Sequence, residues 1–324
     1  INPRRCTCVM AVLLFSAIGQ IAMAQSARIA EIVVKGNKAL NREGIVGASG
    51  LKVGDNITQS SIDSAMRNLV NTGNFGARLI DHPEDAVKVS ASIDPRTGQA
   101  KVVIEVDEND IVKGFNISGS GPIPVKEIQA VLQTKQDRVL NLNVLRTDVA
   151  NIQKLYSDKG YKASVKPDTF GLNGGILEIP LEVATIGTIK LNGLHKTRPK
   201  VVIRELFDQK TGDYYNVNKL QKAYTRIFNT DLFSDIKPTL LTPDPGKVDI
   251  TMSMEEKRTA MVGASVGYST RSKIVGRAEV GETNLFGLGQ QLNLMWEAGG
   301  LANRNSFQLD FTEPWLDRRH TSVA

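Results

Sequence analysis

Side chains that commonly do chemistry are few in this chain and lie far apart. The three histidines are His82, His195 and His320, and none has the neighbouring histidine that a zinc-binding helix or turn requires. Both cysteines, Cys6 and Cys8, lie in the first eight residues, so the rest of the chain has no disulfide and no thiol nucleophile. We therefore expect no metal site, no cofactor and no catalytic centre.

Three short motifs look like parts of active sites but have other interpretations. Gly287–Gly289 matches the start of a dinucleotide-binding fingerprint, but it lies between predicted strands with no helix after it, as a hairpin turn does. Gly119–Gly121 precedes Pro122 and lacks the complete G-x-S-x-G turn of a serine nucleophile. Glu255 and Glu256 stand between two predicted parts of the chain, where we expect a solvated hinge rather than an acid–base pair.

The elements that surround these motifs are clearest near the end of the chain. Within Ala260–Ser269 every second residue is apolar or aromatic, and most of the residues between are small or polar. The alternation returns at residues 291–297 and 307–312. Such strands are typical of a transmembrane β-barrel, whose wall has lipid on one side and the lumen on the other. A one-sided sheet of a soluble protein has the same period of two, so this pattern alone leaves both interpretations open. The side chains expected to face lipid are Leu292, Leu294, Trp296, Phe307, Leu309 and Phe311.

The first 24 residues have the order of a secretory signal peptide. Arg4 and Arg5 precede the apolar run Val9–Ile18, and Ala22–Ala24 then offers small residues at the cleavage positions. The apolar run is too short to cross a bilayer as a helix. We expect cleavage after Ala24 and export of the chain.

The distribution of charged and aromatic residues argues against one class of partner, nucleic acids. The formal net charge is +6, and no Lys/Arg block or interleaved aromatic stripe follows the signal peptide. We therefore expect no nucleic-acid binding.

Between the signal peptide and the alternating strands, the chain repeats one pattern three times. Each unit begins with a short β-rich run that ends in a glycine, and Gly36, Gly119 and Gly193 are 83 and 74 positions apart. Two helical patterns follow, and two strands close the unit. The sequence thus predicts three tandem β-α-α-β-β domains of mixed α+β class. Their predicted bounds are 28–109, 110–185 and 186–257, and about four antiparallel strands follow at 259–324.

These units resemble POTRA (polypeptide-transport-associated) domains, and the strands after them resemble the start of the barrel in the BamA/TamA outer-membrane assembly superfamily. The motifs that carry the resemblance are Tyr214–Asn216, Val262–Ser269, Glu282–Gly289 and Phe311–Trp315. The superfamily's barrel has about sixteen strands, and its Arg-Gly-Phe/Tyr motif is not found in the barrel segment here. We therefore expect a C-terminally truncated piece of a transmembrane β-barrel.

The resemblance implies that unfolded client chains add to exposed sheet edges as extra strands, by β-augmentation. In each POTRA-like unit the implied edge is the strand after the second helix, at Val87–Ile93, Ala163–Thr169 and Ile236–Leu241. The expected client-binding residues on these edges are Val87, Val89, Val165, Ile236 and Leu240. Those on the first barrel strand, which would pair with the client at the barrel seam, are Val262, Gly263, Ala264, Val266, Gly267 and Tyr268.

Two functions of the superfamily remain open at this point. The first is insertion of β-barrel proteins into the outer membrane. The second is export of one dedicated partner, as in two-partner secretion, although those transporters usually resemble a chain with two such units. A periplasmic interaction scaffold is the third class, and the apolar strand face argues against it. The expected partners are unfolded outer-membrane proteins, outer-membrane lipids and accessory periplasmic or lipoprotein subunits. The expected location is the outer membrane, with the soluble domains in the periplasm.

Overall fold

The computed structural model describes residues 27–77, 83–166, 170–270, 273–299, 304–316 and 322–323. The predicted signal peptide at 1–24, with its two cysteines, lies outside these residues, as do His82 and His320. The chain divides after Glu108 into two compact units. Within the described residues, no helix has the length and apolar character needed to cross a membrane.

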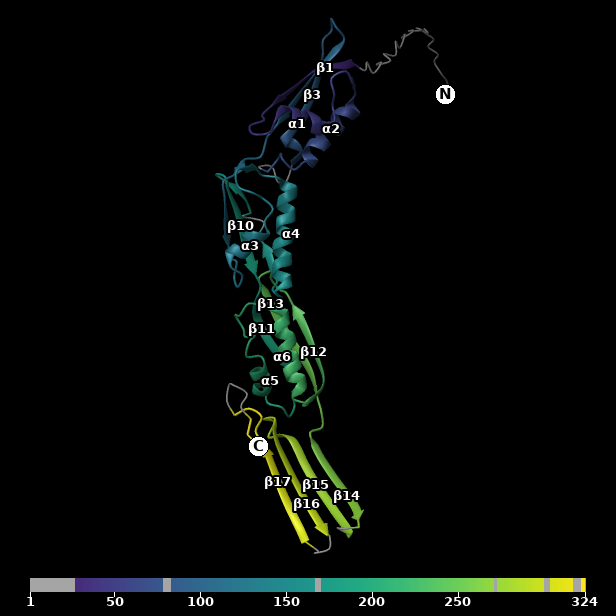
Figure 1. Cartoon of the computed structure of the whole chain (residues 1–324), viewed down its shortest axis with the longest axis vertical. Coiled ribbons are helices and arrows are strands. Elements are labelled where there is room, and N and C mark those ends of the chain that lie inside the picture. Colours follow the sequence, from purple (N-terminus) through teal and green to yellow (C-terminus); the bar gives the residue numbers. More distant parts are fainter. Residues whose placement is uncertain are drawn as a thin grey trace, which may run out of the picture. The chain divides into compact units, whose positions relative to one another are not determined.

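The first unit is a four-stranded mixed sheet packed against two helices (Figure 1). Its elements are β1 (Ala27–Lys35), α1 (Arg42–Ser49), β2 (Asn56–Ile57), α2 (Gln59–Asn71), the 3-10 turn η1 (Pro83–Ala86), β3 (Val87–Ile93) and β4 (Gln99–Val106). The strand order is β2-β1-β4-β3, in which β1 and β4 are parallel and β3 is antiparallel to β4. This order leaves β3 at one edge of the sheet.

The core of the first unit follows from two periodicities. Every second residue of β4 is buried, as expected for a strand with one face against helices. On α2 the buried residues Ala65 and Leu69 are four positions apart, so they lie on one face of the helix. A reciprocal pair of hydrogen bonds between Thr58 and Ser61 caps the start of α2. The helix is thus held at its N-terminus and through one face, and its other faces remain accessible.

The second unit begins with a smaller domain at residues 109–183. Its elements are β5 (Ile111–Val112), β6 (Gly114–Ser118), α3 (Val125–Val131), β7 (Arg138–Val139), α4 (Leu142–Asp158), β8 (Ala163–Val165), β9 (Gly171–Asn173) and β10 (Ile176–Val183). The main sheet has the order β6-β10-β8, β9 also pairs with β10, and β5 pairs with β7. The edge strand β8 has only three residues.

The third domain repeats this plan with longer strands. Its elements are β11 (Thr185–Asn192), α5 (Pro199–Glu205), α6 (Val217–Asn229), β12 (Phe233–Leu241) and β13 (Lys247–Glu256). The order is β11-β13-β12, with β11 parallel and β12 antiparallel to β13. Leu220, Ala223 and Ile227 form the buried face of α6. As in the first unit, the strand after the second helix lies at an edge.

One glycine per domain explains the repeat seen in the sequence. Each has a positive φ, and a Cβ added to it would lie about 2 Å from a carbonyl oxygen on the last strand of the same domain, so only glycine fits. The glycines and their partner carbonyls are Gly36 and Val106, Gly119 and Leu181, and Gly193 and Met254.

Asn216 is one of the residues that link the second and third domains. Asn216 caps α6 through its Oδ1, which accepts hydrogen bonds from the backbone N–H groups of Asn218 and Lys219, both at 3.1 Å. Its Nδ2 donates to the backbone oxygen of Lys159, just beyond the end of α4, at 2.9 Å. Asn216 therefore satisfies the start of one helix and the end of another.

The remaining described residues form one antiparallel sheet. The strands are β14 (Ala260–Ser269), β15 (Lys273–Leu285), β16 (Gln290–Gly299) and β17 (Arg304–Thr312). They lie side by side in chain order, and Figure 1 shows them beside one another. The strands β14 and β17 are the edges, and the predicted hairpin turn at Gly287–Gly289 connects β15 to β16.

Candidate functional site

The register of β14 to β17 gathers the apolar residues on one face of the sheet. Exposed fractions of 83% for Val262, 74% for Phe307 and 67% for Leu309 show that this face is uncovered within the described residues. An exposed apolar surface that spans four strands marks a membrane or protein interaction site. All six residues predicted to face lipid lie in the three rows of directly opposed residues that cross the sheet. These rows are Ala260, Glu282, Leu292 and Phe311; Val262, Val280, Leu294 and Leu309; Ala264, Ala278, Trp296 and Phe307.

The strands also have the length that a bilayer requires. They contain 10, 13, 10 and 9 residues, and a transmembrane β-strand needs about 9–11. The Trp296 and Phe307 rings stack across two neighbouring strands with centroids 6.5 Å apart, which fills the surface between them.

Most residues on the opposite face of the sheet are polar or small, and the apolar exceptions include Met261, Val275 and Met295. Arg277 and Glu297 form an ion pair at 3.0 Å across β15 and β16. On β14 this face carries Gly263 and Gly267, and no atom lies within 4 Å of a Cβ added to either glycine. Neighbours within the sheet therefore do not require these two glycines.

The edge strand β14 is the longest uninterrupted edge in the described part of the chain. It has ten residues and no proline, and its pairing with β15 has no register shift. The predicted side chains Val266 and Tyr268 are 80% and 68% exposed. The outer backbone groups of such an edge are a template for another strand.

The first unit offers a shorter edge of the same kind. All seven residues of β3 pair with β4 without a register shift, and none is proline. Val87 is completely buried and Val89 is half-buried. Their side chains belong to the core of the first unit, so an added strand would contact β3 through the backbone.

The other two predicted edges are less open. On β8, Val165 is half-buried and is the last residue of the strand, and residues 167–169 of the predicted edge lie outside the described residues. On β12, Ile236 is buried at 3% exposure and Leu240 is 44% exposed. The pairing of β12 shifts register between Phe233 and Asp235, and Pro238 lacks the N–H that a partner strand would need.

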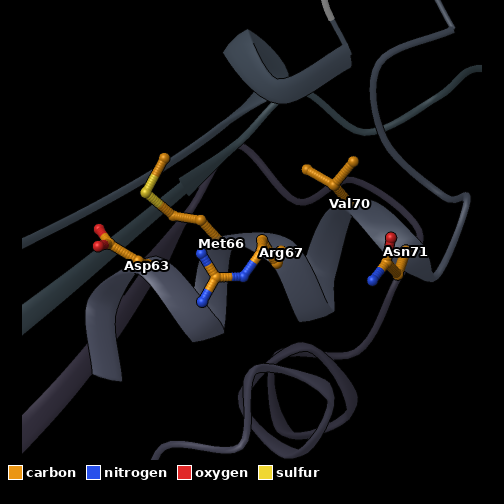
Figure 2. Close-up of a pocket in the computed structure, with 5 residues that line it drawn as sticks. All are labelled: Asp63, Met66, Arg67, Val70 and Asn71. Atoms are coloured by element: carbon orange, nitrogen blue, oxygen red, sulfur yellow. The ribbon is translucent and has the colours of Figure 1, made fainter. Parts of the chain in front are cut away.

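A small groove lies on α2 in the first unit. It has a volume of about 290 Å³, and those of its lining residues that the structure describes belong to α2, the helix that packs against β3. Figure 2 shows Met66 and Val70 rising from the same side of the helix, and both pack in part against the core. The charged residues Asp63 and Arg67 lie beside them. An apolar floor with a charged rim suits one apolar side chain of a bound segment.

The interpretation of Glu255 and Glu256 as a solvated hinge is wrong for Glu256. Its carboxylate accepts hydrogen bonds from the backbone N–H groups of Lys196 at 2.9 Å and Thr197 at 2.7 Å. Partial burial raises the pKa of Glu256, and these hydrogen bonds outweigh it, so the pKa lies below its ordinary value. The carboxylate therefore holds the loop that follows β11.

Glu108 plays the same part in the first unit. It accepts from the backbone N–H groups of Lys38, Ala39 and Leu40. Glu108 and Glu256 each follow the carbonyl partner of the repeat glycine by two positions, whereas the second domain has Val183 there. A glutamate at this spacing is a feature of the repeat that can be found in the sequence.

Sequence reasoning also missed the groove on α2 and the contacts of Lys196 and Thr197. For the groove, the available signal was Met66 and Val70 at a spacing of four on an amphipathic helix. For the loop, it was Glu282, a charge that follows Ala278 and Val280 at every second position of the strand. Across the described residues, no group of three or more His, Cys, Asp or Glu side chains is placed to hold a metal ion.

Comparison with protein families matches the three domains. The model described as "POTRA: Surface antigen variable number repeat" matches residues 27–109, 111–183 and 184–257, which is more than half of the chain.

Two curated relatives cover most of this chain but only part of their own length. The outer membrane protein assembly factor BamA of Neisseria meningitidis serogroup B is 27% identical over 273 residues, which are 78% of this chain and 32% of that protein. The protein of the same name from Nitratidesulfovibrio vulgaris is 26% identical over 253 residues, with coverages of 74% and 30%. This chain thus spans about a third of the length of these relatives.

Solved structures share the fold. The N-terminal domain of Omp85 from Thermosynechococcus elongatus has a TM-score of 0.63 at 19% identity and covers 72% of this chain and 99% of its own. POTRA1-3 of the periplasmic domain of Omp85 from Anabaena has a TM-score of 0.56 at 20% identity, with coverages of 71% and 96%. The mixed α+β class predicted for the three domains is confirmed by these matches.

Proposed function

We propose that this chain, which belongs to the POTRA family, is part of an assembly factor that inserts β-barrel proteins into the outer membrane. Its three POTRA domains lie in the periplasm, and β14 to β17 contribute to a barrel wall in the membrane. The proposal includes no catalytic chemistry and no cofactor. Its partners are unfolded outer-membrane proteins, membrane lipids and accessory periplasmic or lipoprotein subunits.

The observation that carries this proposal is the register of the last sheet. Three rows of residues on one face cross all four strands and are apolar except for Glu282, which lies in the row at the domain end of the sheet. Hydrocarbon provides no hydrogen bonds to backbone groups, so a sheet with this face in lipid must pair its edges with further strands. An unpaired β14 in that environment would bind any chain that offers a strand.

In the proposed mechanism, an incoming client pairs with β14 through its backbone. Backbone pairing does not depend on the client's sequence, which suits a factor with many clients. The edge of β3 and the groove on α2 hold extended client segments in the periplasm before insertion. Gly263 and Gly267 weaken regular pairing of β14 with its barrel partner, because glycine in a strand costs entropy and packs nothing.

The second candidate is a transporter of the same superfamily that exports one dedicated partner. Depletion of the full-length protein in its source bacterium, followed by proteomics of the outer membrane, separates the two. We expect the loss of many unrelated β-barrel proteins. Loss of a single secreted protein would favour the transporter, and an unchanged envelope would contradict both functions.

A substitution tests the role of β14 directly. We expect Gly267→Val in the full-length protein to slow insertion of a reporter barrel into phospholipid vesicles, with the three domains still folded. A Cβ added at position 267 meets no atom within 4 Å, so we expect a slower reaction to come from altered pairing of the edge. Gly171→Val on β9 is the control, because the space around it is equally open. Equal insertion rates for both variants would remove β14 from the mechanism.

A further inference from the structure

The turn between β15 and β16 contacts a loop of the third domain. The backbone N–H of Arg198 donates to the oxygen of Gly287 at 2.8 Å. Gly287 has a φ of +72°, and a Cβ on it would lie 2.0 Å from the backbone oxygen of Lys196. The loop and the turn thus touch backbone to backbone, which only a glycine at position 287 permits.

A buried asparagine stabilises this contact through hydrogen bonds. Asn284 is 1% exposed, and its Nδ2 donates to Oγ1 of Thr197 at 2.9 Å. Its Oδ1 accepts from the backbone N–H of Gly289 at 2.9 Å, which closes the turn. Thr197 is itself 4% exposed. A buried amide that loses its partner costs its full desolvation energy, so this hydrogen bond strongly favours the docked arrangement.

The charge on the apolar face belongs to the same contact. Nζ of Lys196 donates to Glu282 Oε2 and to Thr259 Oγ1, both at 2.7 Å. Glu282 lies in the outermost of the three apolar rows, at the end of the sheet next to the third domain. The backbone oxygen of Thr259, the residue before β14, accepts from the N–H of Thr283 on β15 at 3.0 Å. The loop, the turn and the start of the edge strand are therefore linked through Lys196 and Thr259.

We infer that the loop Lys196–Arg198 and the segment Glu282–Gly289 form a junction latch that holds the third domain at a set position next to the start of β14. Thr197, Asn284 and Gly287 are positioning residues: they touch neither client nor lipid, and they act by placing the edge strand relative to the third domain. The Glu282–Gly289 motif thus has a structural role at this junction. Neither the apolar face nor the open strand edge explains this motif. It rests on the proposed function only in its last step, that β14 receives the client.

The latch can be tested by distance measurement between two spin labels in the full-length protein. Lys222→Cys on α6 and Gln308→Cys on β17 are exposed label sites, and the described residues contain no cysteine of their own. We expect a single narrow distance distribution in the parent protein. Thr197→Val keeps the volume of the side chain but removes the acceptor of Asn284, and we expect it to raise the population of released arrangements about tenfold. Asn284→Ala is expected to broaden the distribution further.

Asn305→Ala is the matched control, because Asn305 is an exposed asparagine on the same sheet. We expect its distance distribution and its insertion rate to equal those of the parent, whereas Thr197→Val and Asn284→Ala should slow reporter insertion without lowering the melting temperature of the three domains. An unchanged distribution in Thr197→Val would overturn the latch. A broadened distribution with unchanged insertion would overturn the positioning role. If the parent protein inserts no reporter, the proposed function fails, and the distance measurement still decides whether the latch exists.

Discussion

Two edge strands of nearly equal length, β12 and β14, differ in three features that affect strand addition. The nine-residue β12 has a register shift near its start, an ion pair between Asp235 and Lys237 at 2.7 Å, and Pro238 near its middle. The ten-residue β14 has none of these features, and its side chains lie exposed on both sides. Bulges, lysines and prolines are the means by which soluble proteins protect free edges from pairing. We therefore expect β12 to stay unpaired in water, and we propose that β14 is open to a partner strand.

The edge of β3 resembles β14 more than β12, although it occupies the same place in its domain as β12. It has no proline and no register shift. The repeat therefore conserves topology but not the availability of the edge. We expect client segments to pair with β3 and to pass β12 without forming a strand there.

The largest expected effect is a charge on the apolar face of β14. We predict that Val266→Asp destabilises the full-length protein in phospholipid vesicles by about 2 kcal/mol, because the carboxylate would lie in hydrocarbon. Denaturant unfolding followed by tryptophan fluorescence measures the change. Ser265→Asp, on the polar face of the same strand, should change stability little. Equal destabilisation by the two variants would show that the faces are assigned wrongly.

Sequence alone accounts for which residues share a face within a strand, because the period of two determines it. It did not predict the rows that cross the sheet, since register depends on the turns that join the strands. The sequence shows Pro238 directly, whereas the register shift beside Phe233 is seen only in the structure. The latch was the hardest feature to predict from the sequence, because Thr197 and Asn284 are 87 positions apart and neither belongs to a periodic pattern.

Proline substitutions in β3 test whether its edge is open. Neighbouring residues of an edge strand alternate between N–H groups that point to the sheet and N–H groups that point outward. We therefore expect one of Ser90→Pro and Ala91→Pro to abolish binding of a fluorescent peptide of alternating Val and Thr while the first unit remains folded. The other variant should destabilise that unit by about 1 kcal/mol, because it removes a ladder hydrogen bond. Peptide binding that survives both substitutions would show that β3 is not the acceptor.

The reverse experiment makes the edge of β12 able to accept a partner strand. We predict that Lys237→Thr combined with Pro238→Val gives β12 measurable affinity for the same peptide, since the second change restores the missing N–H group and the first removes a charge from the edge. Fluorescence anisotropy measures the gain. Thr239→Val adds an apolar side chain to the same edge without adding a donor, and it should have no effect. A gain with Thr239→Val alone would mean that side chains, and not backbone donors, decide whether an edge is used.

The smallest expected effect concerns Glu256, which holds the loop of the latch at the end of β13, the strand that pairs with β12. Because its pKa is lowered in the folded protein, its carboxylate stabilises the fold above the ordinary glutamate pKa of about 4.3. This contribution is lost as the pH falls through the lower folded pKa. We predict that Glu256→Gln weakens the protection of the Lys196 and Thr197 amides by about 1 kcal/mol at pH 7. The difference from the parent should disappear toward pH 3. Hydrogen exchange measures this protection. Taking the ratio of the variant's exchange rate to the parent's at each pH removes the intrinsic pH dependence of exchange. Glu255→Gln changes the exposed neighbouring carboxylate and should leave the ratio near one, so a constant ratio for Glu256→Gln at every pH would show that its charge does not hold the loop.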